Sequence, residues 1–156
     1  MAPKEIKKIM FETFLIIQGL NNVPYRVKNK MLGALFDMNP NPWRVIGITE
    51  KAIIRFKEHD FKYKARMGIN RSHIFPRYKR NKVLLHNDNW TLDKWWDYFY
   101  QNDKCILATS TENLNKEKIV SVKDVPKGLF RSSGYSFTVK EKEQLFLKEC
   151  FKNLRK

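Results

Sequence analysis

The sequence predicts an α+β domain, in which helices come before and after a small unit of mixed strands and helices. Near the amino end, apolar residues recur at three- and four-residue steps, as on one face of a helix, at Ile6, Ile9, Met10, Phe14 and Ile17. A short continuous apolar run at 105–109 is typical of a buried strand. Another helical segment follows Thr138. This order of elements favours the α+β class.

The amino-terminal elements are bounded by turn-forming residues. The first helix is expected over residues 3–19, because Gly19 opens a Gly-Leu-Asn-Asn stretch that stops it. The second is expected over 24–36 and ends before Asn-Pro-Asn-Pro at 39–42, since residues that precede proline are pushed out of the α region.

The remaining elements follow in order along the chain. A helix at 49–57 has Thr49 as its N-cap, and β-like pieces follow at 72–75 and 82–85. A helix at 92–100, capped by Thr91 or Asn89, leads to the strand at 105–109 and a short helix at 111–118. After a loop at 120–136, a last helix runs to about residue 154, with a capping box from Thr138 to Glu141. With 156 residues, the chain fits one domain made of an amino-terminal helical part (1–60), a central part (61–118) and a loop with the carboxy-terminal helix (119–156).

The charge of the chain favours a polyanionic partner. Its 31 Lys and Arg residues against 16 Asp and Glu residues give a net charge of +15. Nucleic acid is the expected partner, because a basic surface is the electrostatic footprint of phosphate-backbone binding. The alternatives are a ribosome-associated protein, a membrane-surface binder and a generally basic proteome. No apolar run is long enough to span a bilayer. We therefore expect an intracellular, cytoplasmic protein that acts on nucleic acid.

The two cysteines, Cys105 and Cys150, lie far apart in the sequence. A zinc knuckle or zinc ribbon requires clustered Cys and His ligands, so the sequence predicts neither. Both thiols are expected to be reduced and buried.

Three segments contain residues suited to phosphodiester chemistry. His73 stands in a basic segment, and an imidazole can act as a general base near neutral pH. Arg71 can stabilise negative charge on a phosphate. The side chains of Asp103 and Asn113 offer oxygen ligands to a hard cation such as Mg²⁺, with Mn²⁺ as the alternative. His86 competes for the role of base, although its Asn- and Asp-rich surroundings indicate a turn.

Between Arg71 and Lys116 the chain contains His73-Ile74-Phe75-Pro76, a later hydrophobic strand, and Glu112-Asn113-x-x-Lys116. This order of motifs is the basis of a resemblance to the HNH (ββα-metal) nuclease family. It implies that residues 61–118 form an HNH-like nuclease core surrounded by helices, with one divalent metal. His73 would then be the general base, Asn113 a metal ligand, and Asn102 or Asp103 the middle position of the motif.

Two features depart from the family pattern. Ser72 stands directly before the base, where the family places an acid or a histidine as the first metal ligand. Ser72 would then occupy that ligand position, with Asp103 supplying the missing carboxylate or with water and phosphate holding most of the metal. The interval between His73 and Asn113 spans 39 residues, so the helix at 90–100 is expected to be an insertion.

Basic residues flank the motif on both sides. We expect them to contact phosphates, which position a nucleic acid without reading its sequence, and they are Lys62, Lys64, Arg66, Arg77, Lys79, Arg80, Lys82 and Lys116. Residues 62, 64 and 66 alternate like one face of a strand. The aromatic cluster at 90–100 is expected in the core, with base stacking as the alternative.

The sequence thus predicts a metal-dependent endonuclease that acts on double-stranded DNA, such as a restriction or mobile-element enzyme. A non-catalytic DNA- or RNA-binding protein is the alternative, favoured by Ser72 in place of an acid. An RNA nuclease differs from the first reading only in substrate. A palindromic target would call for a homodimer.

Overall fold

The computed structural model describes residues 3–133 and 136–154 and divides the chain into two compact units. The first unit combines the residues up to Pro42 with Phe75–Asp103, and the second combines Trp43–Ile74 with the residues from Lys104 onwards. The divisions predicted after residues 60 and 118 do not coincide with these units. The reason is that the helices inserted between two paired strands pack against the amino-terminal helices, with which they share one hydrophobic core.

The first unit consists of helices. They are α1 (Lys4–Gly19), α2 (Tyr25–Phe36), α4 (Arg77–His86) and α5 (Leu92–Asn102). Aromatic rings fill their common core: Trp95 and Phe99 are fully buried, and the ring centroid of Phe99 lies 4.3 Å from that of Phe36. The expectation that the aromatic cluster of α5 belongs to the core is confirmed for these rings.

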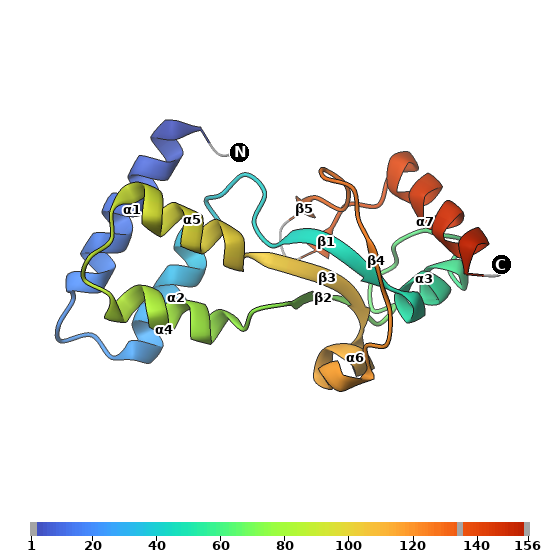
Figure 1. Cartoon of the computed structure of the whole chain (residues 1–156), viewed down its shortest axis with the longest axis horizontal. Coiled ribbons are helices and arrows are strands. Elements are labelled where there is room, and N and C mark those ends of the chain that lie inside the picture. Colours follow the sequence, from blue (N-terminus) through green and yellow to red (C-terminus); the bar gives the residue numbers. More distant parts are fainter. Residues whose placement is uncertain (1–2, 134–135, 155–156) are drawn as a thin grey trace. The chain divides into compact units, whose positions relative to one another are not determined.

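The second unit is built on a four-stranded sheet in the order β2-β3-β1-β4 (Figure 1). The strands are β1 (Arg44–Thr49), β2 (Ile69–His73), β3 (Lys104–Thr109) and β4 (Val122–Asp124). β1 and β3 are parallel, whereas β2 and β4 are antiparallel to their neighbours. The other elements are α3 (Glu50–Lys57), α6 (Ser110–Leu114), the 3₁₀ helix η1 (Lys116–Lys118), the small pair β5 (Ser132–Ser133) and β6 (Ser136–Phe137), and α7 (Glu141–Asn153).

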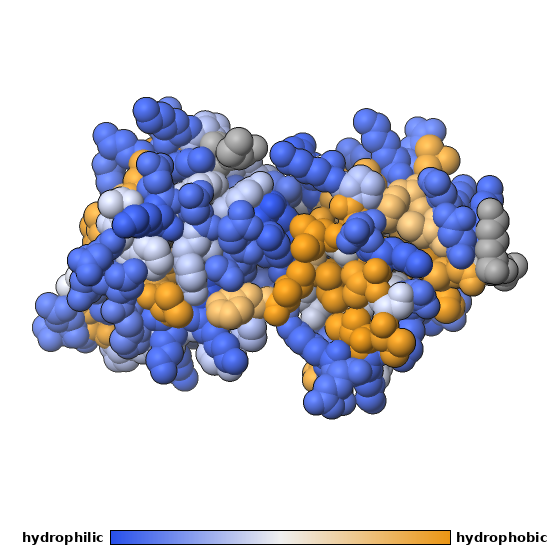
Figure 2. Space-filling model, in the orientation of Figure 1, coloured by the Kyte–Doolittle hydropathy of each residue, from blue (hydrophilic) through white to orange (hydrophobic). Residues whose placement is uncertain are grey.

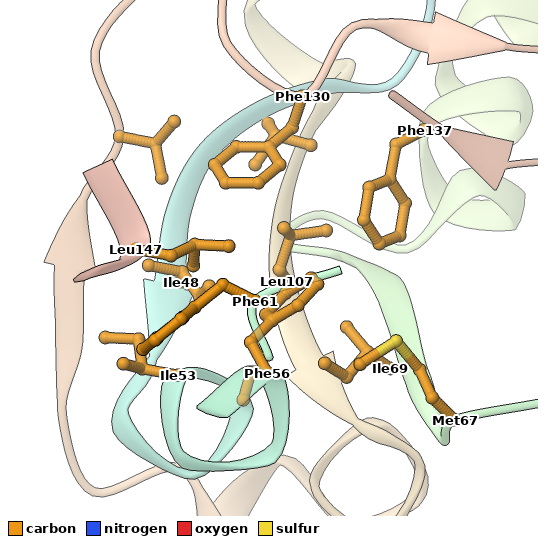
Figure 3. Packing of buried hydrophobic residues seen from close by; sticks show 13 residues of the cluster. Ile48, Ile53, Phe56, Phe61, Met67, Ile69, Leu107, Phe130, Phe137 and Leu147 are labelled. Carbon is orange, nitrogen blue, oxygen red and sulfur yellow. The ribbon is translucent and has the colours of Figure 1, made fainter. Parts of the chain in front are cut away.

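The core of the second unit lies between the sheet, α3 and α7 (Figure 3). Ile48 and Leu107 come from the central strands, and Phe56 and Leu147 come from the two helices. The rings of Phe130 and Phe137, which belong to the segment before α7, pack against the same cluster. These residues hold the sheet and the segment around β5 and β6 together.

Several predicted elements are confirmed and others are wrong. The helices near 3–19, 24–36, 49–57 and 92–100 and the strand near 105–109 are present. Residues 82–85, expected as a β-like piece, belong to α4, because a short apolar run does not distinguish a strand from a buried helical turn. The capping box from Thr138 is also wrong. Glu143 caps α7 instead, by accepting the N–H of Lys140 at 2.8 Å.

The hydropathy of the surface differs between the two units. In the view of Figure 2, hydrophobic atoms gather over the strands of the second unit, whereas the helices of the first unit present mainly hydrophilic atoms. Across residues 3–133 and 136–154, no helix combines the length and the apolar character that crossing a membrane requires.

Candidate functional site

The second unit contains an open polar pocket of about 290 Å³ beside β2. It is lined by Trp43, Tyr63, Ile69, Asn70, Arg71, Asn113, Ser136 and Phe137. Two of the residues predicted from the sequence, Arg71 and Asn113, therefore line one pocket. Among the described lining residues, Arg71 is the one with a formal charge, and none is acidic.

Arg71 is held in place by its neighbours. Its guanidinium lies 4.5 Å from the ring centroid of Trp43, and its Nη1 donates a hydrogen bond to Oγ of Ser132. A stacked guanidinium has less conformational entropy to lose when it binds an anion. Trp43 itself has a φ of 56°, in the left-handed region that non-glycine residues seldom adopt. Strain of this kind persists where the surrounding packing fixes a side chain, as the contact with Arg71 does here.

Two amide side chains add hydrogen-bonding groups to the pocket. Asn70 is exposed, and its Nδ2 donates to Oγ of Ser110 at 3.0 Å. Asn113 is half-buried on α6. Amide side chains both donate and accept, so these two can pair with the edge of a base or with a phosphate oxygen.

The adjacent Glu112 anchors α6 and so positions Asn113. Oε2 of Glu112 accepts hydrogen bonds from Oγ1 of Thr49 (2.8 Å), from Oγ1 of Thr109 (2.9 Å) and from the backbone N–H of Thr109 (2.9 Å). These bonds join the carboxyl ends of the parallel strands β1 and β3. The Glu112 side chain is buried, with 2% of its surface exposed, and it is therefore a structural residue.

An aromatic wall closes one side of the pocket. The ring centroids of Tyr63 and Phe137 lie 4.8 Å apart, and Tyr63 is 36% exposed. Tyr63 belongs to the loop between α3 and β2, in which Lys62, Lys64 and Arg66 are all exposed. The prediction that these three cations alternate along a strand is wrong, because the segment is a loop and Arg66 has a φ of 64°. Their exposure is compatible with the predicted phosphate contacts.

His73 lies at the end of β2 and not in the pocket lining. Its ring packs edge-on against Trp43, with 4.9 Å between ring centroids, and its Nε2 is shielded from solvent. Lys116 donates a hydrogen bond from Nζ to the backbone oxygen of His73, so these two predicted residues do meet. Ser72 is 1% exposed, and its Oγ has no hydrogen-bond partner within the described chain. Neither Nε2 of His73 nor Oγ of Ser72 is therefore presented to solvent.

Two predicted site residues form a buried ion pair in the first unit. Nη1 of Arg80 lies 2.8 Å from Oδ1 of Asp103, and the side chains are 1% and 0% exposed. The sequence predicts Asp103 as a metal ligand and Arg80 as a phosphate contact, whereas the structure buries both side chains and pairs them with each other. Each neutralises the charge of the other inside the core, where an unpaired charge would be costly.

The other predicted residues of the first unit are accessible. Arg77, Lys79 and Lys82 are exposed on α4. Nδ1 of His86, the competing base, lies 2.8 Å from the backbone oxygen of Lys82 at the end of the same helix. Asn102, the other residue proposed for the middle of the motif, donates from Nδ2 to the oxygen of Tyr98 within α5.

The donor set does not fit the divalent metal that the family resemblance implies. Asp103 is committed to Arg80, Ser72 is buried, and Asn113 offers a neutral amide in a pocket whose described lining has no carboxylate. In the described ranges, no three Cys, His, Asp or Glu side chains come together in a group suited to a metal ion. A hard divalent cation prefers carboxylate oxygens, whereas this pocket presents a guanidinium, which attracts anions.

Some residues of the pocket were not predicted from the sequence. Trp43 and Tyr63 lie outside the motif segment, and no local pattern distinguishes them from core aromatics. Asn70 directly precedes Arg71 in the sequence, and this position next to a cation is the signal that the sequence offers for it.

Comparison with protein-family models, with curated proteins and with solved structures finds no match for this chain.

Proposed function

We propose that the protein binds nucleic acid and that the pocket of the second unit holds one phosphate together with the adjoining base. The observation that carries this proposal is Arg71, fixed by Trp43 and Ser132 at an open pocket whose described lining has no acid. A planar guanidinium pairs with two phosphate oxygens at once, and it does so most strongly where water is partly excluded.

The other lining groups suit the base. Tyr63 and Phe137 provide an aromatic surface, and stacking of this kind tolerates any base because every base has a π-face. Asn70 and Asn113 supply amide groups for a base edge. The volume of about 290 Å³ lies at the lower end of the range of ligand pockets and suits a single unstacked nucleotide. The expected ligand is therefore a single strand or a nucleotide turned out of a duplex.

The test is fluorescence anisotropy with labelled single-stranded DNA, single-stranded RNA and duplex DNA, for the wild type and Arg71→Gln. We expect Arg71→Gln to weaken binding at least about tenfold, because the charge-assisted hydrogen bonds from the guanidinium to the phosphate are lost. The matched control is Lys148→Gln, which removes the same charge from an exposed position on α7. It should leave the affinity within about twofold of the wild type. Equal affinities of the two variants would contradict the assignment of the pocket.

A second candidate function is the metal-dependent HNH-type nuclease. The observation that favours it is the order of elements: β2, which ends at His73, pairs antiparallel with β3, and β3 leads into α6, which bears Asn113. Its test is cleavage of plasmid DNA in Mg²⁺ or Mn²⁺ by the wild type, by His73→Ala and in an EDTA control. Metal-dependent cutting that is lost in His73→Ala would favour this function over binding alone.

A further inference from the structure

A second cavity lies in the first unit, between α2 and α4. Its volume is about 490 Å³, and it is lined by Asn29, Lys30, Gly33, Arg77, Tyr78, Arg80 and Asn81. None of these described residues is acidic. We infer that this groove binds the sugar–phosphate backbone of a nucleic acid strand, an inference that rests on the proposed function but concerns a different site.

The hydrogen bonds at the base of the groove leave mainly donors for a ligand. The guanidinium of Arg80 contains no acceptor atom, so its Nε can only donate. It donates to Oδ1 of Asn81 at 3.2 Å. This fixes the amide of Asn81, whose Nδ2 then donates to Oδ1 of Asn29 at 2.7 Å. Each amide oxygen thereby accepts one hydrogen bond within the protein. The N–H groups of Asn29, together with the charged side chains of Lys30 and Arg77, favour an anionic ligand.

The base of the groove is rigid. Arg80 is tied to Asp103, and its guanidinium lies 4.6 Å from the ring centroid of Phe36 in α2. At the start of both helices, the hydroxyl of Tyr25 donates to the backbone oxygen of Tyr78 at 3.0 Å. Burial raises the pKa of Tyr25, which further favours the protonated hydroxyl that donates here. The spacing of α2 and α4 is therefore set before any ligand binds, which lowers the entropy cost of binding.

The distribution of charge indicates a chain of phosphates. α2 has three Lys or Arg residues, α4 has three besides Arg80, which is paired with Asp103, and neither helix has an acid. The acids among the described residues of this unit lie on α1, on α5 or in the segments after α2, α4 and α5, at Glu5, Glu12, Asp37, Asp88, Asp93, Asp97 and Asp103. Lys30 and Arg77 line the groove, and Arg26, Lys79 and Lys82 are further exposed cations on the same two helices. A repeating polyanion can use several such cations, whereas a single phosphate needs only one or two of them.

Gly33 offers a sharp test because it lines the groove inside α2. A Cβ at this position would meet no heavy atom within 4 Å outside the backbone of α2, so a side chain added here starts in open space at the groove. Gly33→Glu places a carboxylate there without removing any existing contact. Gly33→Ala controls for the backbone, and Gly19→Glu controls for net charge, since Gly19 is exposed at the end of α1 in the same unit and equally open.

The experiment measures binding of a labelled oligonucleotide to these variants over a series of salt concentrations. We expect Gly33→Glu to weaken binding at least about tenfold and to lower the slope of log K against log salt by about 0.7–0.9 for each lost phosphate contact. Gly33→Ala and Gly19→Glu should stay within about twofold of the wild type. A second variant, Asn29→Asp, keeps an oxygen for Asn81 but replaces the donors with an acceptor, and it should behave like Gly33→Glu.

Several outcomes would overturn the inference. If Gly33→Glu binds like Gly19→Glu while Arg71→Gln is weakened, the proposed function stands and the groove is not its backbone site. If the wild type binds no oligonucleotide, both fail together. If inorganic tripolyphosphate competes as well per phosphate group as an unlabelled oligonucleotide does, the groove takes free phosphate and the assignment to a backbone is wrong.

Discussion

Nη1 of Arg80 lies 2.8 Å from Oδ1 of Asp103, and this pair is enclosed by the aromatic core of the helical unit. Two residues that the sequence assigned to a nucleic-acid site are thus joined to each other. A structural role for this pair can be distinguished from a catalytic one by measuring stability. Breaking a buried ion pair lowers the free energy of unfolding.

Asp103→Asn should lower the free energy of unfolding by about 3 kcal/mol, since it leaves the Arg80 guanidinium buried without a counter-charge. Urea denaturation measures this change. Asp97→Asn on the exposed face of α5 is the control and should stay within about 0.5 kcal/mol. An unchanged stability of Asp103→Asn combined with lost metal-dependent activity would instead support Asp103 as a metal ligand.

Gly47→Ala should destabilise the sheet by about 2 kcal/mol. A Cβ at Gly47 would lie 2.6 Å from Cγ1 of Val122 and 3.1 Å from Cγ2 of Ile106, so β4 could not approach β1 as closely. Thermal or urea unfolding measures the loss. In a Val122→Ala background the cost should fall to below about 1 kcal/mol, because the closest atom is gone. Strictly additive effects would show that the contact with Val122 does not set the requirement for glycine.

Glu112→Gln should cost about 2 kcal/mol of stability, because the three donors from Thr49 and Thr109 lose a charged acceptor. It should also weaken oligonucleotide binding, since α6 positions Asn113 at the pocket. Measuring unfolding and binding on the same preparation separates the two effects. Binding that is unaffected in the folded variant would show that α6 does not contribute to the site.

Both thiols should resist alkylation in the native protein. Cys105 is fully buried. At Cys150, burial raises the pKa of the thiol and Glu149 raises it further, although Lys123 opposes the shift, so little reactive thiolate forms. Mass spectrometry after iodoacetamide treatment near neutral pH should show labelling at least about tenfold slower than in urea. Rapid native labelling of Cys150 would contradict this arrangement of α7.

The helices could be predicted from the sequence because their apolar spacing is local information. Thr49 and Thr91 act as N-caps as predicted, accepting the N–H groups of Ala52 and Lys94. Strand β1 was missed. Its apolar run is short and is interrupted by Gly47, which is present because a neighbouring strand approaches closely, a fact that only the tertiary fold reveals.

The site was harder to predict, because its residues meet through pairings distant in the sequence. Arg80 stands among exposed lysines and looks like a surface residue until the fold brings it to Asp103. Conversely, the sequence predicts Arg71 and Asn113 as parts of a catalytic motif. They do line a common pocket, but with Trp43 and Tyr63 rather than with His73. Residue type was therefore informative about charge, and the fold was needed to show which charges face solvent.

The most direct test of the pocket is the affinity of wild type and Asn113→Asp for one labelled oligonucleotide, measured in EDTA and in Mg²⁺. The substitution is isosteric, and it places a carboxylate in the pocket that Arg71 also lines. If the pocket binds phosphate and base, Asn113→Asp should bind at least about fivefold more weakly in EDTA, and Mg²⁺ should not restore its affinity. Binding that Mg²⁺ restores or tightens in Asn113→Asp, or cleavage that appears with the metal, would contradict this assignment and favour a metal site.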